Sequence, residues 1–200
     1  MLGDLWSFQG RYRTLHLTWI AFFLTFVVWF NLAPLATTVK ADLGLTVGQI
    51  RTVAICNVAL TIPARVLIGM LLDKFGPRIT YSSILVFSAI PCLLFASAQD
   101  FNQLVVARLL LSIVGAGFVI GIRMVAEWFP PKEIGLAEGI YGGWGNFGSA
   151  FSALTMVALA GFLSFSGGFE LPTGAVLNWR GAIALTGIVS TVYGLFYFFN

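Results

Sequence analysis

The sequence has 200 residues, of which 58% are hydrophobic and 10% are charged. Soluble domains carry about 25% charged residues, so this composition excludes a water-soluble enzyme, a nucleic-acid-binding domain and a disordered tail. The formal net charge of +3 comes from cations scattered between long apolar stretches. In such a chain the cations report membrane topology and give no sign of nucleic acid as a partner.

Six apolar stretches are long enough to cross a lipid bilayer as helices, which takes about 20 residues each. They cover 15–39, 50–72, 79–97, 103–126, 136–163 and 181–199. The polar and aromatic segment 1–14 lacks a small-residue cleavage site, so we expect it to remain as a cytoplasmic N-terminal segment. Because backbone polar groups must be satisfied inside lipid, the pattern predicts an all-α membrane protein with a six-helix bundle over 15–200.

The basic residues near the loops predict the orientation of the chain in the membrane. With the N-terminus inside, the inner side receives more cations than the outer side. The inner cations are Arg11, Arg13, Lys74, Arg78, Arg123 and Lys132, and the outer ones are Lys40, Arg51 and Arg180. We therefore expect a multi-pass protein of the plasma (inner) membrane with a cytoplasmic N-terminus.

The second span carries polar residues at every fourth position, along one slowly drifting helix face. They are Asn57, Thr61, Arg65, Gly69 and Asp73. Arg65 lies about 12 Å along the helix axis from Asp73, too deep for its charge to reach the inner surface easily. The acidic residues near the membrane gather at that inner surface. Arg65 is therefore either a structural arginine that donates to carbonyls of a neighbouring helix or a cation that awaits an anion.

Three residues of the next spans leave similar alternatives open. Arg108 lies about two turns from the outer end of span four, close enough for its charge to reach the outer surface. This position fits a structural role as well as a functional one. Phe118, in the middle of the same span, is either a packing residue or a ligand-facing aromatic. Asn146, in span five, needs a hydrogen-bond partner, which is either a neighbouring carbonyl or a small polar solute.

Glycines dominate span five, and at 100° per residue four of them share one wedge of the helix with Asn146. These are Gly135, Gly139, Gly142 and Gly143, whereas Gly145 and Gly148 lie outside the wedge. Small residues at such spacing let helices approach closely in lipid. The pattern predicts that this wedge packs against a neighbouring helix.

The stretch between spans two and three, GMLLDKFGPR, is similar to the cytoplasmic loop signature of the major facilitator superfamily. The matching residues are Gly69, Asp73, Lys74, Gly76 and Arg78. Arg108, followed by Gly115 and Gly117, is similar to the span-four signature of the same family.

A second stretch, GGWGNFG, resembles the glycine–asparagine signature in span five of the nitrate/nitrite porter family. Its residues are Gly142, Gly143, Gly145, Asn146 and Gly148. Residues 115–133 and 29–45 also look like the cyanobacterial-type nitrate/nitrite permeases.

This resemblance implies a nitrate/nitrite transporter with alternating access, not an enzyme, that uses neither a cofactor nor a metal. It implies that Arg65 contacts the anion, Phe118 stacks on it and Asn146 lies beside it. Family members have twelve spans, so the chain resembles an N-terminal half whose partner is a C-terminal six-helix half. The alternatives are a transporter of the same superfamily for another small anion and a six-span membrane scaffold that does not transport.

Overall fold

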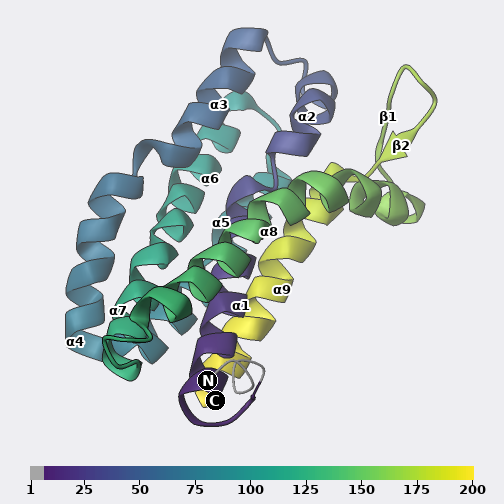
Figure 1. Cartoon of the computed structure of the whole chain (residues 1–200). Coiled ribbons are helices and arrows are strands. Elements are labelled where there is room, and N and C mark those ends of the chain that lie inside the picture. Colours follow the sequence, from purple (N-terminus) through teal and green to yellow (C-terminus); the bar gives the residue numbers. More distant parts are fainter. Residues whose placement is uncertain (1–6) are drawn as a thin grey trace.

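The computed structural model describes residues 7–200, which form a bundle of long helices (Figure 1). The helices are α1 (Gly10–Phe30), α2 (Ala36–Asp42), α3 (Val47–Ala59), α4 (Thr61–Phe87), α5 (Ala89–Ser97), α6 (Phe101–Ser112), α7 (Phe118–Trp128), α8 (Ile134–Phe162) and α9 (Trp179–Phe199). The 3₁₀ segments η2 (Ala33–Leu35), η3 (Ile113–Gly117) and η4 (Leu163–Ser166) adjoin them. Strands β1 (Phe169–Glu170) and β2 (Val176–Leu177) pair as an antiparallel hairpin before α9. The predicted all-α class is confirmed.

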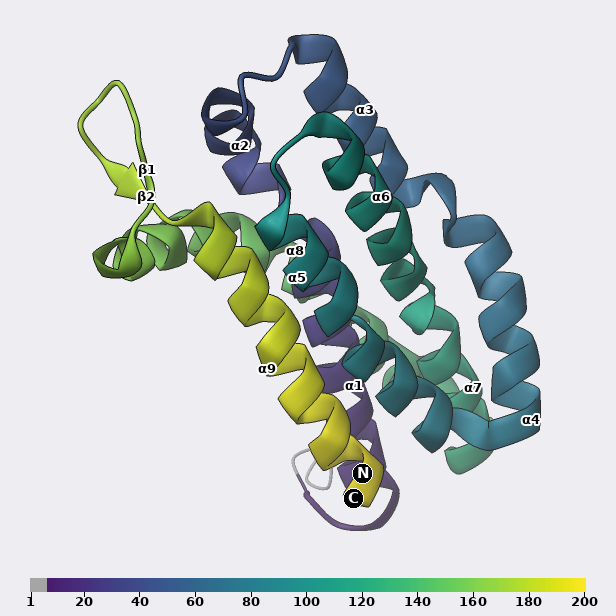
Figure 2. The same ribbon diagram turned by 180° about the vertical axis from the view of Figure 1, so that it is seen from behind.

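The first helix, α1, begins at Gly10, five residues before the predicted start of span one and inside the polar segment 1–14. Residues 1–6 of that predicted cytoplasmic segment lie outside the described residues. The beginning of α1 and the end of α9 lie at the same end of the bundle (Figures 1 and 2).

Five helical stretches of the described chain are long and apolar enough to cross a membrane. They are Gly10–Asp42, Val47–Ser97, Phe101–Trp128, Ile134–Ser166 and Trp179–Phe199. The second stretch has 51 residues, far more than the roughly 20 residues that one crossing needs. It contains a reversal of the chain, which Figure 2 shows at the lower end of α4. The arrangement of six crossings in a membrane stays a prediction.

The reversal lies at Gly76, where φ is 79° and ψ is 170°, a backbone conformation that essentially only glycine adopts. Pro77 follows, and a proline disfavours helical geometry in the residue before it. The two residues therefore divide α4 into a first arm, 61–75, and a second arm, 77–87. The first arm contains the end of the predicted span two, and the second arm contains the beginning of the predicted span three.

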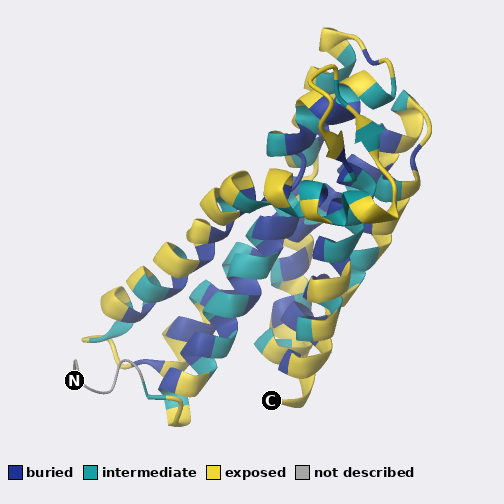
Figure 3. Ribbon diagram, turned by 90° about the vertical axis from the view of Figure 1, so that its right-hand side faces the viewer, coloured by how far each residue is buried: buried dark blue, intermediate teal, exposed yellow. Residues whose placement is uncertain are grey.

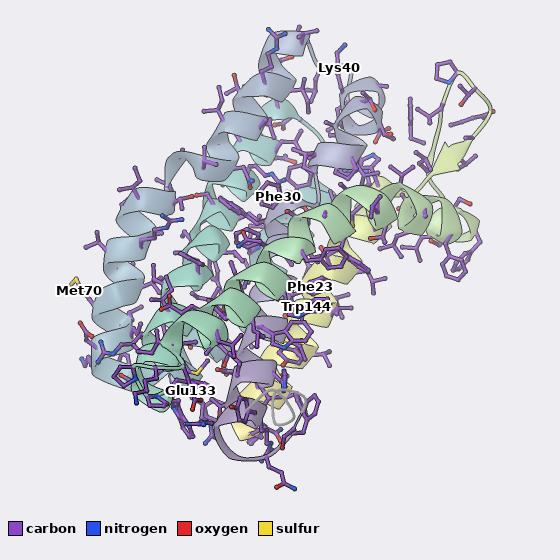
Figure 4. The ribbon with its side chains drawn as sticks, viewed as in Figure 1. Phe23, Phe30, Lys40, Met70, Glu133 and Trp144 are labelled. Atoms are coloured by element: carbon purple, nitrogen blue, oxygen red, sulfur yellow. The ribbon has the colours of Figure 1, made fainter. Side chains whose placement is uncertain are left out.

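Helix α8 crosses α1 at close range, and two of its glycines make this approach possible (Figure 1). A Cβ atom at Gly145 would overlap the ring of Phe22, and one at Gly148 would collide with the carbonyl oxygen of Phe23. Phe23 and Trp144 both lie in this region of the bundle (Figure 4). Because only a hydrogen atom fits at these two positions, glycine sets the distance between α1 and α8.

The prediction that the wedge of Gly135, Gly139, Gly142 and Gly143 packs closely is wrong for the described chain. A Cβ atom at any of these four glycines would meet no atom within 4 Å. The buried stripe of α8 lies instead on another side of the helix, where it comprises Ala137, Tyr141, Gly145, Gly148, Ser152, Met156 and Ala160. The wedge therefore lies on an open surface of the bundle.

Figure 3 shows the buried residues on the faces that the helices turn toward one another and the exposed residues on the outward faces. Many of the exposed residues are large and apolar. Ile62 and Leu154, for example, are 78% and 76% exposed. An apolar outer surface of this extent is unusual for a water-soluble protein and suits contact with lipid chains.

We predict that Gly148→Ala destabilises the protein, whereas Gly161→Ala in the same helix does not. The added methyl at position 148 would press on the backbone of α1, which costs about 1–3 kcal/mol of unfolding free energy. At position 161 the nearest atom to a new Cβ, in Leu177, lies at an ordinary 3.7 Å. Thermal unfolding of the purified protein measures both variants, and equal midpoints would contradict the close α1–α8 contact.

Candidate functional site

Two helix breaks lie beside each other inside the bundle. The first separates α3 from α4 at Leu60, because Pro63 has no N–H to donate to the carbonyl of Ala59. The second is η3, the 3₁₀ segment that joins α6 to α7. α4 packs against η3, and the hydroxyl of Thr61 donates to the carbonyl of Ser112 at 3.5 Å. Broken helices at this position leave irregular backbone where transporters commonly bind solutes.

Arg65 lies one turn after the first break and is exposed. Within residues 7–200 its guanidinium has neither a hydrogen-bond nor an ion-pair partner. Other members of its polar row are tied to neighbouring helices: Asn57 Nδ2 donates to the carbonyl of Trp29 at 2.9 Å. Arg65 is therefore a free cation at the surface of an apolar helix. The carbonyl partner that a structural arginine would need is absent from the described part of the chain.

Phe118 is the first residue of α7, directly after η3, and is half-buried. Its ring centroid lies 5.4 Å from that of Phe22 and 6.3 Å from that of Tyr141. Helix α7 packs against both α4 and α8, so Phe118 belongs to the helix between those of Arg65 and Asn146. Part of the ring remains open to a ligand.

Asn146 lies in the middle of α8 and is exposed. Its Nδ2 donates to the carbonyl of Gly142, one turn earlier in the same helix, at 2.7 Å. Of the two partners that the sequence leaves open, the described chain supplies a carbonyl. No hydrogen bond or ring contact joins Asn146, Phe118 and Arg65 to one another among residues 7–200.

Tyr141 is a further residue of this region, which the sequence analysis missed. Its hydroxyl donates to the carbonyl of Phe118 at 3.0 Å and lies 3.1 Å from the hydroxyl of Tyr81. Its ring stacks on Phe22 with a centroid distance of 4.9 Å. Gly121 makes room for it, since a Cβ there would overlap the tyrosine ring. Tyr141 therefore fixes the junction of η3 and α7. The small-residue stripe on which it lies, with Ala137 and Gly145, is the pattern that could have revealed it.

The loop motif around the Gly76 reversal connects three helices. Arg123 of α7 donates to Asp73 at 2.7 Å and to Glu127 at 2.5 Å, so the carboxylate of Asp73 joins the ends of α4 and α7. The Nε atom of Arg78 donates to the carbonyl of Phe198 at 2.5 Å. The Nζ atom of Lys74 lies 5.2 Å from the ring centroid of Phe75. A Cβ at Gly69 would meet no atom within 4 Å.

Arg108 is buried between helices, an environment that favours the structural one of its two possible roles. Its side chain is 2% exposed, so it does not extend to the outer surface. Nη1 donates to Asn31 Oδ1 at 3.0 Å, and the guanidinium lies 5.2 Å from the ring centroid of Phe95. Its Nε atom has no hydrogen-bond partner among the described residues. This arginine joins α6 to α1 and α5.

Residues 7–200 contain no group of three or more His, Cys, Asp or Glu side chains that could hold a metal ion. The three candidate residues themselves offer a cation, an aromatic ring and an amide.

A helical bundle with broken spans beside an unpaired arginine has the architecture of one half of a secondary transporter. The chain belongs to the Major Facilitator Superfamily, whose model matches residues 18–200. The crystal structure of a bacterial homolog to the human lysosomal transporter Spinster, in the inward-facing and occupied conformation, shares the fold. Its TM-score is 0.74 at 19% identity, over 96% of this chain and 44% of that chain.

Comparison with sequence relatives shows which members of the superfamily this chain resembles. The nitrate/nitrite transporter NrtP of Picosynechococcus sp. is 62% identical over 100% of this chain, and NrtP of Nostoc punctiforme is 61% identical over 99%. The probable nitrate transporter NarT of Staphylococcus carnosus is 30% identical over 87%. The resemblance to the nitrate/nitrite porters is thus confirmed, and these relatives are named as transporters, not enzymes. The chain spans 40%, 38% and 41% of their respective lengths.

We predict that Arg108→Ala and Arg65→Ala differ sharply in their effect on stability. Arg108→Ala leaves a cavity and a buried amide oxygen of Asn31 without its donor, which costs about 3 kcal/mol of unfolding free energy. Arg65→Ala removes an exposed side chain, so the change stays within about 0.5 kcal/mol. Midpoints of thermal unfolding in detergent compare the two. A large loss for Arg65→Ala would mean that Arg65 is a structural residue.

Proposed function

We propose that the chain forms one half of a nitrate/nitrite transporter that works by alternating access, and that a second six-helix half completes the anion site. Two relatives named nitrate/nitrite transporter, at 62% and 61% identity, support the substrate. The chain spans only 40% and 38% of these relatives, which leaves enough length in each for a second set of six helices.

The proposal depends mainly on the unpaired guanidinium of Arg65. A charged side chain at membrane depth is costly unless it is paired, and such residues commonly mark the path of a substrate. Arg65 is exposed and without a partner in the described chain, beside the two helix breaks. Nitrate and nitrite are small planar anions, and a guanidinium donates to two of their oxygens in one plane.

Phe118 and Asn146 complete this half of the proposed site. The partly open ring of Phe118 would pack on the flat face of the anion, and Tyr141 would hold this ring in place through the Phe118 carbonyl. The amide of Asn146 would exchange its bond to the Gly142 carbonyl for a bond to the anion. An amide adds a directed donor without adding a second charge.

The open glycine wedge of α8 is the proposed contact surface for the second half. A groove of about 480 Å³ runs along it, lined by glycines at 135, 139 and 143 together with Trp144 and Phe147. The absence of side chains here would let a helix of the second half approach closely. Asp73 and Arg123 lie at the inner end of the bundle, where their ion pair would form and break as the two halves rock.

The orientation belongs to the same proposal. We place the protein in the plasma (inner) membrane with six crossings and the N-terminus in the cytoplasm. The greater number of cations at the end of the bundle that holds Arg13 and Arg78 supports this orientation.

We predict that Arg65→Lys in the whole transporter abolishes most nitrate uptake, whereas Arg51→Lys does not. Lysine keeps the charge but lacks the planar pair of donors. Arg51 is an exposed cation near the start of α3, so the same exchange there serves as the matched control. Uptake of labelled nitrate is measured and normalised to the amount of protein inserted in the membrane. Normal uptake by Arg65→Lys would refute the two-point anion site.

A further inference from the structure

A second candidate site lies in the fork between the two arms of α4. The arms diverge from the reversal at Gly76, which Figure 2 shows at the lower end of the bundle. Between them lies an apolar groove of about 450 Å³, with Ile113 of η3 as part of its floor. Its walls include Leu67, Leu71 and Phe75 from the first arm and Ile79, Ser83 and Phe87 from the second.

We propose that this groove binds one acyl chain of an anionic phospholipid, with the lipid phosphate against Lys74. The groove is open to the outside of the bundle, and its rim exposes Leu67, Phe75 and Ile79 to 54%, 46% and 44%. Exposed apolar side chains around a concave surface favour an apolar ligand.

The length of the groove is close to that of one leaflet of a bilayer. Each wall advances eight residues, 67–75 on the first arm and 79–87 on the second, or about 12 Å along a helix. Half of the hydrocarbon core of a bilayer is about 15 Å thick. One acyl chain that runs from the Gly76 reversal toward the middle of the membrane therefore fits the groove along its length.

Two hydroxyl-bearing residues, Thr80 and Ser83, lie along the second wall of the groove. The hydroxyl of Thr80 is buried and has no hydrogen-bond partner in residues 7–200, and Thr80 lines the groove. Ser83 is exposed one turn further along the same wall. An ester carbonyl of a phospholipid is an acceptor for the exposed hydroxyl of Ser83.

Charge at the open end selects an anionic lipid. Lys74 is exposed, and its Nζ lies over the ring of Phe75, a residue of the groove wall. The neighbouring carboxylate of Asp73 is already paired with Arg123 at 2.7 Å. Lys74 therefore has no ion-pair partner among the described residues, and a phosphate would supply one.

The test measures lipid retained by the whole purified transporter, in native mass spectrometry, after incubation with equal amounts of phosphatidylglycerol and phosphatidylcholine. We expect the parent protein to retain more phosphatidylglycerol than phosphatidylcholine. Lys74→Gln should lower phosphatidylglycerol retention about fivefold, the effect of one lysine near an anionic surface. Lys132→Gln, which removes an exposed cation of the turn before α8, is the control and should retain as much as the parent.

A second pair of variants tests the groove itself. Ser83→Trp fills the groove and should reduce the bound lipid by one molecule, whereas Val192→Trp, on an exposed position of α9, should not. Thermal unfolding confirms that each variant is folded, and Ser83→Leu replaces Ser83→Trp if the larger side chain prevents folding. Unchanged lipid retention in the groove-filled variant, or retention without preference for phosphatidylglycerol in the parent, would overturn the proposal.

Discussion

The close approach of α8 to α1 is the contact on which the candidate anion site depends. Because Gly145 has no side chain, the ring of Phe22 lies directly against the backbone of α8. That ring stacks on Tyr141, whose hydroxyl donates to the carbonyl of Phe118. The position of the Phe118 backbone therefore depends on the short α1–α8 distance that Gly145 and Gly148 permit. Lipid chains are as apolar as the helix surfaces, so the hydrophobic effect does not drive helices together in a membrane. The contact between α1 and α8 therefore depends on how closely their surfaces fit.

Two arginines of this chain lie in opposite environments. Arg108 is fully surrounded, and its cost of burial is offset by the amide oxygen of Asn31 and the ring of Phe95. Arg65 has neither kind of contact within residues 7–200, although it too lies within an apolar span. A cation whose own chain satisfies it holds helices together, whereas one that its own chain leaves unpaired is available to a ligand.

Helix α4 contributes to both proposed sites because it is interrupted twice. The break before Thr61, which Pro63 causes, lies near Arg65 and faces η3. The reversal at Gly76 separates two arms and leaves the apolar groove between them. An uninterrupted helix satisfies all of its backbone hydrogen bonds in lipid, so a break occurs only where a residue favours another backbone conformation. In α4 these residues are Pro63 at the first break and Gly76 at the reversal.

The sequence by itself determined the properties that depend on local chemistry. Apolar length predicted the all-α class, and the loop motif predicted a connection between two spans near Gly76. The lack of an acidic residue at the depth of Arg65 argued against an ion pair but left open whether Arg65 is structural or awaits an anion. Only the tertiary structure decided which face of α8 meets α1, that Tyr141 supports Phe118, and that Arg108 is enclosed. Helical periodicity states which residues share a face, but two glycine-lined faces of one helix are equally able to pack. The choice between them depends on the side chains of the neighbouring helix, and these come together only in the folded bundle.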